Sequence, residues 1–323
     1  MGIQNDYGDY LNKLISRFWE YRDKHFGGRD DLFDTRYSDR SGPCVFTDAA
    51  ADHNVLTRPG ASEGEVRAVV SAIPSEDRHR WFRSMSSSQA VAQSVFGNLV
   101  YCGKLELLEN LLDCDGSPLF GKGIRKCTLE VPVGYLGEPR CTSLDAFLEG
   151  DRRVAIECKL AEEKIGPCSR PGLKTDHSRH CNGDYEVQRE RSHRCSLTEF
   201  GVQYWTHIPK LFNHDWSADQ DHMPCPLRDT YQLVRNILAA CVDPEEPHEV
   251  APESGHCVLL YDANNPMFWE GGKAMKAWQD TKDGLKYPAL LQKCSWQELM
   301  PCIRKDPDLK WLSDALGEKY GLA

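Results

Sequence analysis

Residues 142–160 read TSLDAFLEGDRRVAIECKL, and this stretch decides the fold. Polar and apolar side chains alternate on either side of the Gly-Asp-Arg sequence at 150–152, which predicts two antiparallel strands joined by a short turn. Each strand carries an acid among apolar neighbours, Asp145 in the first and Glu157 in the second. Charged side chains interrupting an apolar strand are costly, so these two positions are the first candidates for a functional site.

The length of the turn decides whether the two acids meet. If residues 150–152 form a three-residue turn, Glu149 pairs with Arg153 and Asp145 then lies directly opposite Glu157. Opposed residues hold their Cβ atoms about 4.5–5.5 Å apart, so two carboxylates there repel each other unless a cation lies between them. A two-residue turn would shift the register by one and place the acids on opposite faces of the sheet.

Lys159 completes a candidate hydrolytic cluster. It lies two residues after Glu157, so both side chains share one face of the strand. Two carboxylates and a free backbone carbonyl suit a hard cation such as Mg²⁺ or Mn²⁺, and a neighbouring lysine can orient or deprotonate water and neutralise charge developing on phosphorus. The spacing alone arises by chance about once in a chain of this length, so a surface hairpin with ordinary charges is the alternative interpretation.

The remainder of the chain predicts an α/β fold, with a mixed four-stranded core sheet flanked by helices. Helical spacing of apolar residues predicts helices at 9–26, 87–112, 227–241, 288–300 and 308–319, and two further strands are expected at 127–133 and 257–262. We expect a core over residues 84–265, a helical and irregular N-terminal extension over 1–83, and a helical C-terminal extension over 266–323.

Asp145, eleven intervening residues and then Glu157-Cys158-Lys159, set in the order helix, three strands, helix, strand, resemble the PD-(D/E)XK nuclease superfamily. The likeness covers roughly residues 84–265 and is to bacterial restriction-endonuclease-like proteins with a cysteine-bearing insertion. It implies that Asp145, Glu157 and the Cys158 carbonyl bind Mg²⁺ and that Lys159 assists the attacking water. Leu144 stands where the name of the motif has proline.

The resemblance also implies a function and auxiliary residues. Gln89 and Gln232 match auxiliary positions of some members, where the side chain would contact either a metal-binding residue or a phosphate of the substrate. The function implied is metal-dependent hydrolysis of DNA, by an endonuclease in DNA defence or processing, with a second copy of the chain or a defence complex as further partners. The alternative is a catalytically inactive nucleic-acid-binding or scaffolding subunit with the same fold.

A long connection over residues 163–226 separates the third strand from the next helix, and connections of this length usually have a role. It carries Cys168, Cys181, Cys195 and Cys225. Four such ligands could hold a structural Zn²⁺, which would make the segment a metal-stabilised interaction module, but no Cys-x-x-Cys pair is present. Scattered reduced thiols are the alternative interpretation.

Charge and hydropathy limit the partners. The formal net charge is −10, so a surface that binds nucleic acid through phosphates must be local. Residues 164–194 are the best candidate, because this stretch carries seven basic side chains and four acidic ones (Lys164, Arg170, Lys174, Arg179, Arg189, Arg191 and Arg194 against Asp176, Asp184, Glu186 and Glu190). No signal sequence and no membrane-spanning apolar run is visible, which predicts a cytoplasmic protein without a membrane partner.

Overall fold

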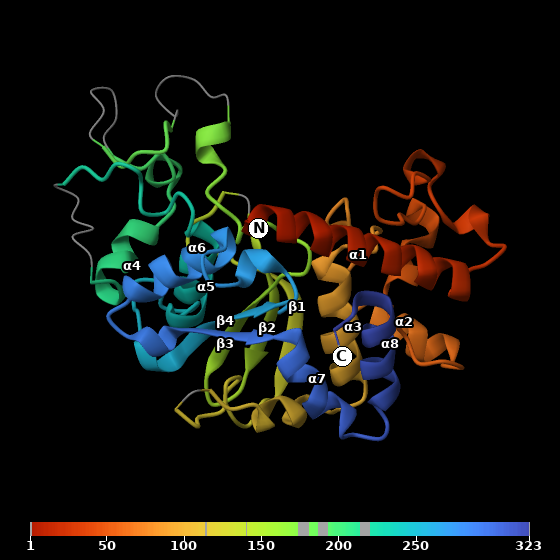
Figure 1. Cartoon of the computed structure of the whole chain (residues 1–323). Coiled ribbons are helices and arrows are strands. Elements are labelled where there is room, and N and C mark those ends of the chain that lie inside the picture. The colour runs from red at the N-terminus through yellow and green to blue at the C-terminus, as the bar shows by residue number, and fades with distance from the viewer. Residues whose placement is uncertain are drawn as a thin grey trace.

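A five-stranded mixed sheet lies at the centre of the computed structural model, which describes residues 2–113, 115–139, 141–173, 181–186, 193–213 and 220–322 (Figure 1). The strands follow one another in chain order across the sheet: β1 (Lys126–Pro132), β2 (Ser143–Glu149), β3 (Arg153–Cys158), β4 (Gly255–Tyr261) and β5 (Leu291–Ser295). The first three are antiparallel neighbours, and β4 and β5 continue the sheet in parallel.

Helices cover both faces of this sheet. Buried side chains of one face pack with α1 (Ile3–His25), α3 (Ser88–Tyr101), α7 (Trp296–Arg304) and α8 (Lys310–Tyr320). The opposite face packs with α4 (Tyr204–Leu211), α5 (Tyr231–Cys241) and α6 (Lys273–Asp283), and α2 (Glu63–Val70) lies against α3. Successive side chains of β3 point to opposite faces of the sheet. Ile156 therefore packs in the cluster of the first face and Ala155 in that of the second.

The prediction of a mixed sheet flanked by helices is confirmed, but the predicted number of strands is wrong. The segment 288–300, expected to be one helix, contains a 3₁₀ turn (Pro288–Leu290), then β5, and only then α7. The reason is non-local: β5 pairs in parallel with β4, more than thirty residues earlier in the chain. The helix begins where Ser295 and Glu298 form a reciprocal capping box.

Both ends of the chain pack against the sheet. Phe18 of α1 meets Tyr320 of α8 edge to face, with ring centroids 5.9 Å apart, inside the cluster that also contains side chains of β2, β3 and β4. The division into a core and two extensions stays a prediction.

The 163–226 segment joins β3 to α5, and α4 within it lies at the left of the molecule in Figure 1. Its described parts contain two short 3₁₀ helices (Arg170–Gly172 and Thr198–Phe200) and α4. Four of its predicted phosphate-contacting residues lie outside the described residues (Lys174, Arg179, Arg189 and Arg191). Within the described chain, no helix is both long enough and apolar enough to cross a membrane.

Candidate active site

The β2–β3 hairpin has the three-residue turn on which the site hypothesis depends. Glu149 pairs with Arg153, and residues 150–152 form the turn between them. The ladder keeps this register as far as Ala146 and Ile156, and continuing it by one position would set Asp145 opposite Glu157. The predicted register is therefore confirmed.

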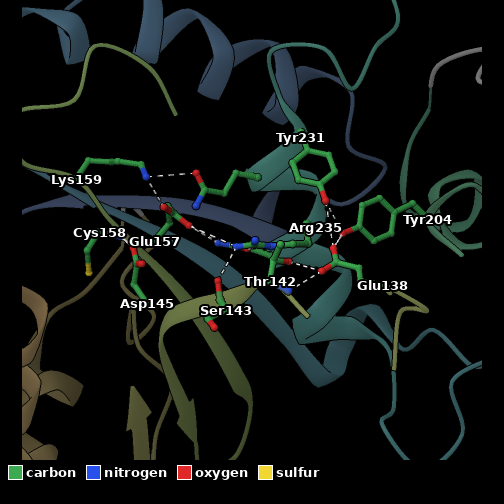
Figure 2. Close-up of polar contacts among 12 residues, drawn as sticks. Glu138, Thr142, Ser143, Asp145, Glu157, Cys158, Lys159, Tyr204, Tyr231 and Arg235 are labelled. Atoms are coloured by element: carbon green, nitrogen blue, oxygen red, sulfur yellow. Dashed lines mark hydrogen bonds and ion pairs between the residues drawn. The ribbon is translucent and has the colours of Figure 1, made fainter. Parts of the chain in front are cut away.

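Glu157 and Lys159 lie toward α5. The strand neighbours of Glu157, Ile156 and Cys158, pack on the opposite face with α1 and α3. Because side chains alternate, Glu157 points away from that cluster and toward α5, and Lys159 follows it by two positions. Asp145 of β2 lies near them, since the charges of both act on its carboxyl group. Figure 2 shows the three side chains close together at the ends of β2 and β3.

Main-chain pairing between β2 and β3 ends at Ala146 and Ile156, one position short of the two acids. Asp145 Oδ2 accepts a hydrogen bond from the Cys158 backbone N–H at 2.6 Å. In an antiparallel pair the N–H and C=O of one residue point to the same side of the strand. The Cys158 carbonyl therefore faces the side on which Asp145 lies.

Glu157 is fully buried, and each of its oxygens has a partner. Its Oε1 accepts from Lys159 Nζ at 2.5 Å and its Oε2 from Asn236 Nδ2 of α5 at 2.8 Å (Figure 2). The Arg235 guanidinium lies 3.9 Å from the same Oε2 and donates to the backbone oxygen of Ser143 at 3.0 Å. A buried carboxylate is tolerated only with such partners, and α5 and β3 together supply them to Glu157.

Electrostatics in the cluster suit a cation. Burial and then the charge of Glu157 raise the pKa of Asp145 well above its usual range. Burial alone would lower the pKa of Lys159, but the charges of Glu157, Glu162 and Asp145 outweigh it, and the pKa lies above its usual value. Lys159 is therefore a stable cation in this state, better suited to hold a charged oxygen than to act as a base.

Glu130 of β1 is a third carboxylate at the site, and the sequence interpretation missed it. It stands opposite Asp145 in the β1–β2 register, at the one position where that ladder is interrupted, and its φ is +49°. Burial, together with the charges of Glu157 and Asp77, raises its pKa to about 7, although hydrogen bonds from Gln89 and Ser143 act in the opposite direction. Its signal in the sequence was an acid inside the apolar strand CTLEVPV.

These groups open into a cleft of about 890 Å³. Glu130, Asp145 and Lys159 line it together with Gln89, Gln232 and Glu162. The opposite wall comes from residues outside the predicted core, among them Tyr37, Arg78, His79 and Trp81. The N-terminal segment is thus part of the site. No local pattern in the sequence predicts that this segment lines the cleft.

Gln89 and Gln232 both lie beside the cluster. Gln232 Oε1 accepts from Lys159 Nζ at 3.3 Å, and Gln89 Oε1 accepts from the His79 backbone N–H at 2.9 Å. Gly166 makes room for Gln232: its φ is +28°, and a Cβ at this position would overlap the Gln232 side chain.

A second buried carboxylate, that of Glu138, fixes the start of β2. It accepts hydrogen bonds from the Thr142 backbone N–H at 2.8 Å, from the Thr142 hydroxyl and from the hydroxyls of Tyr204 in α4 and Tyr231 in α5 (Figure 2). This network ties the loop before β2 to both helices, and so holds Ser143 and Asp145 in place.

The oxygen donors fit a hard divalent cation. Asp145, Glu157 and the Cys158 carbonyl are all oxygen ligands of the kind that Mg²⁺ and Mn²⁺ prefer. Among the described residues, no group of three or more His, Cys, Asp or Glu side chains is already arranged as a metal site. A cation here would therefore rest on two carboxylates and a backbone oxygen, with water or substrate completing its shell.

A family model described as restriction endonuclease associating with ARP matches residues 38–321. The chain belongs to this family. The residues matched by the REase-ARP model include the sheet, α8 and N-terminal residues that line the cleft, such as Arg78 and Trp81. Membership of this family points to a nuclease-related role. No curated protein and no solved structure matches the chain significantly.

Proposed function

We propose that this chain is a divalent-metal-dependent deoxyribonuclease of the PD-(D/E)XK type, which hydrolyses phosphodiester bonds of DNA as an endonuclease in defence or processing. The observation that carries the proposal is the meeting of Asp145, Glu157 and Lys159 at one end of the β2–β3 hairpin, inside a cleft. Membership of the REase-ARP family supports the nuclease class.

Each residue of the cluster has a distinct role. Asp145, Glu157 and the Cys158 carbonyl would hold Mg²⁺ or Mn²⁺, which supplies Lewis acidity toward the phosphate and a more acidic water. Lys159, charged and held at Glu157, orients the water and stabilises negative charge developing on phosphorus. Asn236 fixes the rotamer of Glu157, and Gln232 contacts the Lys159 ammonium from the cleft side. Gln89 forms a side-chain hydrogen bond with Glu130 of β1, the strand next to β2.

DNA is the substrate that we propose for the cleft. The cleft is rich in acids near the hairpin, so a phosphate would enter only with its cation, whereas Arg78 and His79 lie on the opposite wall. The family description includes an association with ARP, which supports the search for a protein partner besides DNA and a second copy of the chain.

A cleavage assay with Mg²⁺ or Mn²⁺ tests this function. Purified Asp145→Asn, Glu157→Gln and Lys159→Ala variants should each lose at least about 100-fold in the rate of DNA cleavage, because each removes a cation ligand or the charge that stabilises the transition state. Glu149→Gln is the matched control: it changes an acid four residues from Asp145 on the same strand, whose partner is Lys126 at the surface (2.6 Å). Equal activity of all five proteins would end the proposal for this site.

The alternative function is an inactive nucleic-acid-binding or scaffolding subunit. It predicts DNA binding by the wild type without cleavage under any divalent cation, and no change of binding in the Lys159→Ala variant beyond that of the control. The intact cluster favours the enzyme, because a chain that only binds DNA has no need for a fully buried Glu157.

A further inference from the structure

Four cysteines from different parts of the 163–226 segment come together. Cys168, Cys181, Cys195 and Cys225 are spread over 58 residues, yet each thiol lies within electrostatic range of the other three. Cys181 and Cys195 are buried, and Cys168 and Cys225 are half-buried. None of the four takes part in the candidate nuclease site.

Backbone hydrogen bonds hold three of the four segments together. The Cys168 N–H donates to the Arg228 oxygen at 2.9 Å, and the Cys225 N–H donates to the Gly183 oxygen at 2.8 Å, two residues after Cys181. The Arg228 N–H closes a turn onto the Cys225 oxygen at 2.9 Å. The segment of Cys195 joins them through the side chains of Arg170 and Ser196, whose Nε and Oγ lie 3.4 Å apart.

Three of the four sulfurs receive backbone N–H groups from the residue two positions later. The Cys168 sulfur accepts from Arg170, the Cys195 sulfur from Leu197 and the Cys225 sulfur from Leu227. Donors aimed at sulfur stabilise a thiolate, which is the form that binds metal.

Cysteines packed in the core behave in the opposite way. Cys241 donates its S–H to the Gly255 oxygen at 3.5 Å, and Cys294 donates to the Ser295 oxygen at 3.2 Å, as neutral thiols do. The acceptor role of the Cys168, Cys195 and Cys225 sulfurs thus differs from the donor role of Cys241 and Cys294.

We propose that Cys168, Cys181, Cys195 and Cys225 bind one structural Zn²⁺ ion. Zinc in structural sites takes four ligands in a tetrahedron, and four thiolates form one of its standard sets. Among the described residues no three His, Cys, Asp or Glu side chains already lie as metal ligands, so binding requires the four sulfurs to move toward one another. Each thiol gives up its proton to solvent as it binds.

The segment has a physical need for such an ion. Regular structure in its described parts is limited to short 3₁₀ helices, α4 and an isolated bridge between Tyr185 and His222. Four neighbouring thiolates repel one another and are tolerated only with a compensating cation, and the ion in turn crosslinks four loops.

Metal analysis of the full chain, purified without added metal, tests the proposal. We expect about one zinc per chain and an X-ray absorption spectrum with four sulfur neighbours at about 2.3 Å. A protein without zinc, zinc bound by nitrogen or oxygen, or iron in its place would overturn the assignment.

Variants locate the ion. Cys181→Ser and Cys225→Ser should each lose most of the zinc, whereas Cys141→Ser, at an exposed cysteine outside the segment, should keep it. Zinc retained in both cluster variants would contradict the proposal. If these variants do not fold, a thiol-reactive reagent on the wild type decides instead, since chelation must expose four additional reactive thiols. The Asp145→Asn variant should keep its zinc whatever its cleavage activity, so the two proposals fail separately.

Discussion

The Glu157–Lys159 pair shows how the site is built at the scale of a residue. A buried ion pair contributes little net stability compared with an apolar pair of similar size, yet breaking it is costly because one charge is left without its partner. Glu157 is fully buried and Lys159 nearly so. Retaining such a pair beside a cleft that Lys159 lines is understandable if the charges serve chemistry.

Removing one member of this pair should destabilise the metal-free protein. We expect Lys159→Met to lower the free energy of unfolding by about 3–5 kcal/mol, and the double variant Glu157→Gln/Lys159→Met to recover most of that loss. Denaturant unfolding of the metal-free protein measures both. Equal stability of the single variant and the wild type would show that Glu157 is not charged when buried.

Glu130 should make the stability of the metal-free protein depend on pH. Its ordinary pKa of 4.5 is raised to about 7 in the folded chain, chiefly by burial and also by the neighbouring acids. Between these two values the folded state binds the proton more tightly than the unfolded state, so this group favours folding increasingly as the pH falls from about 7 to about 4.5. Glu130→Gln should remove that contribution, whereas Glu270→Gln, at an exposed acid, should not.

Chemical unfolding across this pH range measures the effect, and Mg²⁺ titrations should show the affinity falling over the same interval because protons and cations compete for the carboxylates. Identical pH dependence of the wild type and Glu130→Gln would exclude a raised pKa at this residue.

Residue-level prediction from the sequence succeeded where the determining contacts are local. The turn at 150–152 is three residues long, so the opposition of Asp145 and Glu157 followed from counting. The position of Glu130 opposite Asp145 could not be predicted in this way, because the ten residues between β1 and β2 do not fix the register of the two strands.

At the scale of elements, the Glu138 network connects the loop before β2 with α4 and α5. Glu138→Ala would remove the acceptor of the Thr142 N–H and leave the Tyr204 and Tyr231 hydroxyls only each other, at 3.3 Å. Unpaired buried donors cost about 1–3 kcal/mol each, so we expect a clear drop in melting temperature and a smaller one for Glu138→Gln, which keeps one acceptor oxygen.

Thermal unfolding compares these two variants with Glu20→Gln, an exposed acid of α1. Cleavage activity should fall in Glu138→Ala as well, because the position of Asp145 depends on the start of β2. Equal melting temperatures for the alanine and glutamine variants would contradict this role of the carboxylate.

Strongly periodic elements were predictable, and elements held by distant partners were not. Helix α3 begins after Ser87 as its capping pattern predicts, and the strands of the hairpin lie within a residue or two of their predicted bounds. The segment Leu291–Ser295 has no alternating pattern, and only pairing with β4 makes it a strand. Helix α4 follows a long irregular stretch and carries a proline, so its sequence resembles a loop.

At the scale of the whole molecule, the two ends of the chain meet at Lys319. Its buried ammonium donates to both oxygens of Asn54, at 2.7 and 2.8 Å, and so links α8 to the N-terminal segment. Burial lowers its pKa from 10.5 to about 7, although the charge of Cys44 acts in the opposite direction. Above pH 7 the unfolded chain binds this proton more tightly than the folded one, so stability gains with rising pH.

Lys319→Met should lack this gain. We expect the stability of the wild type relative to the variant to rise between pH 7 and pH 9, by up to about 1.4 kcal/mol per pH unit. Lys305→Met, at an exposed lysine, provides the control. A constant difference across the range would show that Lys319 keeps its ordinary pKa.

The cleft is also a property of the whole molecule. Its floor comes from the hairpin and its opposite wall from residues near Tyr37 and Trp81, more than forty residues before β1. The sequence resemblance therefore located the reactive groups but not the surface that faces them, because that surface depends on how α1, α3 and α8 pack.

The central claim is that Asp145 and Glu157 share a divalent cation. Anomalous diffraction from crystals soaked in Mn²⁺ tests it most directly. We expect one peak within about 2.0–2.4 Å of a carboxylate oxygen of each residue and of the Cys158 carbonyl, and its loss in Asp145→Asn. A cleft without a peak at saturating Mn²⁺, or a peak that persists unchanged in the variant, would contradict the account.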